Sequence, residues 1–144
     1  MTRAIVFFAA CLIPVAAQAP TNPLAAVHSV FVQGNSEVAS AIRKELERQA
    51  KVFPQHNREV CLSLAVNPKD ADAILDIQEQ AKLGGIIAGP GVTASGMLTN
   101  HEGDMLWSDA KSGDNGMIHS GAGGAAQFLL QSLEKKVCPK WHHL

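Results

Sequence analysis

Histidines are the residues of this chain best suited to acid–base or metal chemistry, and the sequence contains six of them. His101 and His119 fall in segments that are predicted to be loops, and Glu102 and Asp104 follow His101 closely in the sequence. Such side chains could activate water in a small hydrolase, or bind a divalent metal, if they converged in one pocket. The histidine pair at 142–143 is adjacent in sequence, a spacing that suits only weak metal binding. We therefore assign no metal ligand and no catalytic residue.

Glycine clusters at 84–91 and 121–124 invite comparison with phosphate-binding loops. Neither cluster contains the G-K-[ST] end of a P-loop, and neither forms G-x-G-x-x-G directly between a strand and a helix. The pairs Ser95-Gly96 and Ser120-Gly121 lack the flanking residues of a nucleophile elbow. We predict flexible loops here and expect no cofactor.

Two of the three cysteines, Cys61 and Cys138, lie outside the N-terminal segment. In an oxidising compartment they could form one internal disulfide. Such a bridge would close a loop of roughly 77 residues and stabilise the fold by about 4 kcal/mol in the chain-entropy model. The alternative, a buried Cys61 and a free Cys138, stays open because geometry decides between the two.

The first 19 residues have the order of a cleavable signal peptide. A basic start at Arg3 precedes an apolar run over 4–17, and Ala17 and Ala19 form an A-x-A cleavage pattern. The run of ~14 residues is shorter than the ~20 needed to span a membrane. Cys11 lacks the context of a lipoprotein cleavage site, so lipid anchoring is disfavoured. We predict an exported protein, periplasmic or secreted, with a signal peptide at 1–19, one domain at 20–144 and no membrane span after cleavage.

The charge balance gives no support for nucleic-acid binding. The sequence has 12 basic and 13 acidic side chains, and only Arg3 lies in the leader. Proteins that bind nucleic acids usually carry a basic excess on one surface. With 47% hydrophobic and 17% charged residues, the composition is that of an ordinary globular domain.

Hydrophobic periodicity predicts strands and helices in the order β-α-β-β-β-β-α. A strand over 27–32 precedes a helix capped by Asn35 or Ser36, whose apolar stripe is Val38, Ile42 and Leu46 with Ala39 and Ala50 beside it. Further strands are expected over 60–66 (largely buried), 71–78 (alternating), 92–99 and 105–108, with loops over 83–91 and 111–124 and a final helix over 125–137. Trp107 is expected in the core.

These elements favour an α+β fold arranged as a two-layer sandwich. A mainly antiparallel or mixed sheet of four to five strands, with both helices on one face, would bury each amphipathic stripe once.

Four segments carry a family resemblance: the strand at 27–32, the helix at 39–46, the A-D-A-I-L strand at 71–75 and the G-x-x-L-W turn at 103–107. With them the chain resembles small exported bacterial proteins of the kind frequent among Acidobacteria. More distantly it is similar to the domain shared by the curli secretion lipoprotein CsgG and the TolB amino-terminal domain. The resemblance implies an envelope protein and transfers no functional residue. This chain departs from the pattern in lacking a lipobox and in its glycine-rich loop.

The sequence therefore favours an exported, non-enzymatic envelope accessory that binds another envelope protein through a sheet edge or its glycine-rich loops. The alternative is a small periplasmic hydrolase or metal-dependent enzyme built on the loop histidines. The oligomeric state is left open.

Overall fold

The computed structural model describes residues 22–56, 58–82, 91–113 and 121–139. The predicted signal peptide, the loop at 83–90 and His119 lie outside these ranges. The elements are β1 (Ser29–Gln33), α1 (Glu37–Val52), β2 (Ser63–Leu64), β3 (Ala73–Lys82), β4 (Gly91–Thr99), β5 (Met105–Gly113) and α2 (Gly121–Val137), with short 3-10 turns at Pro23–Ala26, Pro54–His56 and Pro68–Asp70.

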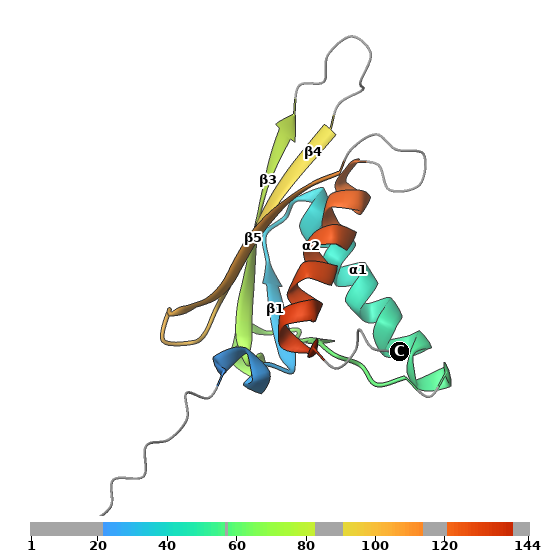
Figure 1. The fold of residues 1–144 in the computed structure, drawn as a ribbon, viewed down its shortest axis with the longest axis vertical. Coiled ribbons are helices and arrows are strands. Elements are labelled where there is room, and N and C mark those ends of the chain that lie inside the picture. The colour runs from blue at the N-terminus through green and yellow to red at the C-terminus, as the bar shows by residue number, and fades with distance from the viewer. Residues whose placement is uncertain (1–21, 57, 83–90, 114–120, 140–144) are drawn as a thin grey trace, which may run out of the picture.

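The strands form one mixed sheet in the order β2-β1-β3-β4-β5. β1 is parallel to both β2 and β3, whereas β3, β4 and β5 are successively antiparallel. Both helices lie on the same side of this sheet (Figure 1). The predicted α+β class, element order and two-layer architecture are therefore confirmed. Within the described part of the chain, no helix is long and apolar enough to cross a membrane.

The core lies between the sheet and the two helices. Alternate residues of each strand point into it, so that Val30, Leu75 and Leu98 are exposed by 1% or less. Leu129 of α2 is equally buried, and Trp107 is 8% exposed, which confirms its expected place in the core.

Side chains from two elements fix the start of α1. The Ser36 hydroxyl accepts a hydrogen bond from the Ala39 N–H at 3.1 Å, as an N-cap does. The Glu79 carboxylate of β3 accepts from the Val38 N–H, also at 3.1 Å. Because helix N-termini attract negative charge, Glu79 ties α1 to the middle of the sheet.

Glycines allow α2 to lie directly on β4 and β5. A Cβ built on Gly96 would lie 2.9 Å from Leu129 Cδ2, and one on Gly113 would lie 2.1 Å from the carbonyl oxygen of Gly121. Both distances are shorter than the normal separation between a Cβ and a carbon or oxygen atom. The close contact of this helix with the sheet therefore depends on the missing side chains.

The predicted boundaries of four elements were wrong. The strand expected over 60–66 is reduced to β2, and Val66 is 85% exposed. β2 pairs with β1 at two positions, Ser63 opposite Ser29 and Leu64 opposite Val30, before the chain turns at Pro68–Asp70. β3 and β5 are longer than predicted and α2 begins at Gly121, so part of the expected loop over 111–124 is strand and helix.

Candidate binding surface

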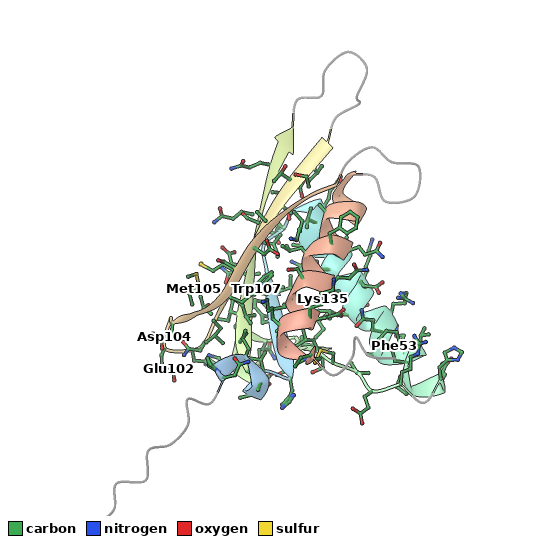
Figure 2. The ribbon with its side chains drawn as sticks, in the orientation of Figure 1. Phe53, Glu102, Asp104, Met105, Trp107 and Lys135 are labelled. Carbon is green, nitrogen blue, oxygen red and sulfur yellow. A yellow bond between two sulfur atoms is a disulfide. The ribbon has the colours of Figure 1, made fainter. Side chains whose placement is uncertain are left out.

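The loop histidines do not form a catalytic site among the described residues. His101 Nε2 lies 2.7 Å from the carbonyl oxygen of Ala71, which ties the β4–β5 turn to the start of β3. Asp104 exchanges hydrogen bonds with Asn100 inside that turn, and Glu102 lies exposed at its tip (Figure 2). No group of three histidine, cysteine or acidic residues within the described ranges could hold a metal ion. The enzyme alternative also needs His119, which is outside those ranges, and so it gains no support.

Cys61 and Cys138 are joined by a disulfide, with their Cα atoms 6.1 Å apart. The bridge connects the residue after α2 to the segment leading into β2. It resolves the alternative that the sequence left open, and it anchors the end of α2 at the opposite edge of the sheet from β5.

The sheet has a second face, which neither helix covers (Figure 1). Strand register aligns its residues in cross-strand rows. We call this surface the open face. Its first row is Phe31, Ile74, Thr99 and Met105, and its second row is Gln33, Asp76, Met97 and Ser108. Its third row is Gln78, Ser95 and Ala110, and its fourth row is Gln80, Thr93 and Ser112.

Two methionines form the apolar centre of the open face. Met97 is 41% exposed and Met105 is 63% exposed, and the half-buried Phe31 and Ile74 continue the apolar surface toward β1. A register shift between Leu98 and Thr99 places Met105 opposite Thr99, one row from Met97. In Figure 2, Met105 lies on the side of the sheet away from α2.

Polar groups surround this centre. A shallow hollow of about 430 Å³ adjoins Met97, and the polar residues that line it are Asp76, Gln78, Ser95, Ser108 and Asp109. One row further along, the hydroxyls of Thr93 and Ser112 are 2.9 Å apart and hydrogen-bonded. The surface therefore combines exposed apolar side chains with mainly uncharged donors and acceptors and the carboxylate of Asp76.

The charged groups of β5 belong to the other face, beside α2. Asp109 accepts hydrogen bonds from the Ser132 hydroxyl and from the Ala110 N–H, and it pairs with Lys111 at 2.9 Å. The bond from Ser132, followed by that from Lys111, lowers the pKa of the Asp109 carboxyl. These charges are therefore engaged in holding β5 against α2, and within the four rows named above Asp76 is the charged residue.

Sequence reasoning missed this surface because it looked for binding at a strand edge and in glycine-rich loops. The available signal was the alternation of Thr93, Ser95, Met97 and Thr99 along β4, which places one methionine on the polar side of the strand.

Comparisons with known proteins identify structural neighbours only. No family model matches the chain, and no curated protein matches it significantly. Two PelC dodecamer structures from Paraburkholderia phytofirmans match with a TM-score of 0.45, at 16% and 15% identity, over 76% of this chain and 86% of theirs. The DUF330 protein XCC0632 from Xanthomonas campestris matches with a TM-score of 0.42 and 11% identity, over 85% of this chain and 87% of its own. Similarity at this level assigns no function, and the resemblance to CsgG and TolB domains stays a prediction.

Proposed function

We propose that this chain is an exported, non-enzymatic envelope protein that binds a protein partner on the open face of its sheet. The observation that carries the proposal is the pair of exposed methionines, Met97 and Met105, on the sheet face that neither helix covers. A two-layer fold normally buries only one face of its sheet, and exposed large apolar groups gathered on the other face mark interaction sites.

The chemistry of the open face fits a protein better than a nucleic acid or a charged metabolite. Protein interfaces have an apolar centre depleted in charge and a polar rim, and methionine is enriched at such centres. Methionine side chains also adapt to irregular partner surfaces. Here the rim consists mainly of serine, threonine and glutamine, and Asp76 is the charged open-face residue beside Met97.

The disulfide supports export. Disulfides persist in oxidising compartments and are rare in the cytosol of most cells. A bridge between Cys61 and Cys138 is thus consistent with the signal peptide predicted at 1–19.

The test is site-specific photo-crosslinking of the full chain in its native cells. A photoreactive residue replaces Met97 or Met105 in two proteins, and Glu47, which is exposed on α1, in a matched control. We expect one protein partner to be crosslinked at both methionine positions and not at the control. Binding of that purified partner should then weaken at least tenfold in a Met97→Glu chain and stay unchanged in a Glu47→Gln chain.

Three results would overturn the proposal. Equal crosslinking at Glu47 would show that the open face has no special role, and products containing only a second copy of this chain would replace a foreign partner with self-association. A Met97→Glu chain that binds the partner as well as the original does would place the contact elsewhere.

A further inference from the structure

A buried acid and a buried amide meet where α1 and α2 pack together. Glu134 of α2 is 7% exposed and Gln49 of α1 is 5% exposed. Gln49 Nε2 donates to Glu134 Oε1 at 3.0 Å and to Glu45 Oε1 at 3.3 Å. Gln49 Oε1 is buried, and no donor among the described residues reaches it.

An ionised Glu134 would leave this arrangement incomplete. A carboxylate only accepts hydrogen bonds, so Gln49 Oε1 would stay without a donor and the negative charge would be buried. A protonated carboxyl carries an O–H group, which can donate to Gln49 Oε1 while the other oxygen accepts from Gln49 Nε2. One proton therefore satisfies the amide and removes the charge.

Within the part of the chain that the structure describes, the charged groups around Glu134 do not provide a counter-ion for it. From α1 come Glu45 and Arg48, and Arg48 donates to both Glu45 oxygens at 2.6 and 2.7 Å. From α2 itself comes Lys135, which is exposed (Figure 2). β5, which also packs against α2, brings Asp109 and Lys111, which pair with each other at 2.9 Å. The short strand β2 beside α1 brings no charge. A groove of about 460 Å³ between the helices reaches Glu134, so a proton can exchange with solvent.

The two carboxyls of this cluster are shifted in opposite directions. Burial, and to a lesser degree the negative charge of Glu45, raise the pKa of Glu134, against a lowering by the Gln49 hydrogen bond. The hydrogen bond from Arg48 instead lowers the pKa of Glu45. Two glutamates bonded to the same amide nitrogen thus differ in their affinity for a proton, because Glu134 is buried and Glu45 is hydrogen-bonded to an arginine.

We propose that Glu134 and Gln49 form a proton-controlled latch between α1 and α2. While the Glu134 carboxyl holds its proton, acid and amide exchange two hydrogen bonds and the helices are locked together. Loss of the proton at higher pH leaves a buried charge and an unpaired acceptor, and the contact between the helices weakens.

The test compares the wild-type chain with Glu134→Gln, which keeps the shape and the donor but cannot ionise. Folding raises the pKa of Glu134, so the folded state holds more protons than the unfolded state. The contribution of Glu134 to the free energy of unfolding is therefore complete below the unfolded pKa, and it falls as pH rises toward the folded pKa. Urea unfolding should therefore show the wild type losing stability relative to Glu134→Gln from about pH 4 upward. Each unit by which folding raises the pKa corresponds to about a tenfold change in the unfolding equilibrium constant.

A matched control and a second readout separate the latch from a general charge effect. Glu47→Gln removes the same charge from an exposed site of α1, and its stability should follow the wild type at every pH. Carbon NMR of the wild type, with the Glu134 signal assigned by its absence in Glu134→Gln, should show Glu134 losing its proton above the ordinary glutamate value of about pH 4.3. Loss of the proton at or below that value would overturn the proposal, as would parallel stability curves for wild type and Glu134→Gln.

Discussion

The two faces of the sheet consist of the same strands and differ in what lies over them. Along β4, Leu98 faces the helices and is fully buried, whereas its neighbour Met97 faces away and is 41% exposed. The face on which both helices lie, which we call the covered face, holds the tightly packed residues. They include glycines at which a side chain would have no room. The open face holds flexible and small polar residues. Stability should therefore reside almost entirely on one side of the sheet, which leaves the other free to change with a binding partner.

The largest contrast is expected from truncating one apolar side chain on each face. Leu129→Ala removes a buried side chain that lies over Gly96, and we expect it to cost about 2–5 kcal/mol in the free energy of unfolding. Met105→Ala removes a side chain that is 63% exposed, and surface changes of this kind stay within about 0.5 kcal/mol. Urea denaturation followed by circular dichroism measures both. Equal losses would mean that something covers the open face.

The second contrast concerns the bridge that holds α2 on the covered face. Replacing Cys138 by Ser removes the disulfide with Cys61, which spans 77 residues, and should cost about 2–4 kcal/mol. Adding reductant should destabilise the wild type by a similar amount and leave the Cys138→Ser chain unchanged. If reductant has no effect on the wild-type unfolding midpoint, the bridge contributes nothing to the covered face.

The covered face was largely predictable from the sequence. Val38, Ile42 and Leu46 recur at helical spacing, and Ala73, Leu75 and Ile77 alternate as a strand must, so α1, β3 and the element order followed directly. The end of the stripe on α1 was misassigned, since Gln49 is buried and Ala50 exposed. Periodicity favours the apolar residue, whereas the packing of Gln49 depends on its contact with Glu134.

The open face was predictable only in part, because most of its evidence lies in pairs of residues distant in sequence. The alternation along β4 places Met97 on the polar side of its strand, whereas Met105 would be assigned to a core and a register shift decides its direction. Gly113 appeared to belong to a loop, yet it is covered by α2. Local patterns do not reveal which helix lies over which strand, and so they could not identify the uncovered face.

Two glycines, Gly113 in β5 and Gly123 in α2, test how closely the helix packs against the strand. Gly113→Ala would place a Cβ 2.1 Å from the Gly121 carbonyl oxygen and 2.9 Å from the Ala125 nitrogen, and such overpacking should cost about 1–3 kcal/mol. Gly123 lies exposed in α2, with nothing within 4 Å of a Cβ there. Gly123→Ala should therefore stabilise the helix by about 0.5–1 kcal/mol. Thermal unfolding of both variants tests the opposite signs, and a stabilised Gly113→Ala chain would contradict the close contact.

The smallest expected effect comes from Asp72, an exposed carboxylate just before β3. It accepts hydrogen bonds from the His28 and Ser29 N–H groups at 2.9 and 2.8 Å, and from the Ser29 hydroxyl at 3.0 Å. The bond from the His28 N–H is the main cause that lowers the pKa of Asp72. Because the folded pKa lies below the unfolded value, the ionised group adds stability above about pH 4, and this contribution is lost as pH falls through the folded pKa.

Asp72→Asn should accordingly cost no more than about 1 kcal/mol near neutral pH, since solvent screens an exposed carboxylate. The difference from the wild type should shrink as pH falls below about 4 and the Asp72 carboxyl takes up its proton. Chemical denaturation at pH 7 and at a series of lower pH values distinguishes this from a purely steric effect, which would persist at every pH. If Asp72→Asn loses as much free energy of unfolding at pH 7 as Leu129→Ala does, an exposed polar contact stabilises the fold as much as a buried side chain of the covered face. The contrast between the two faces would then fail.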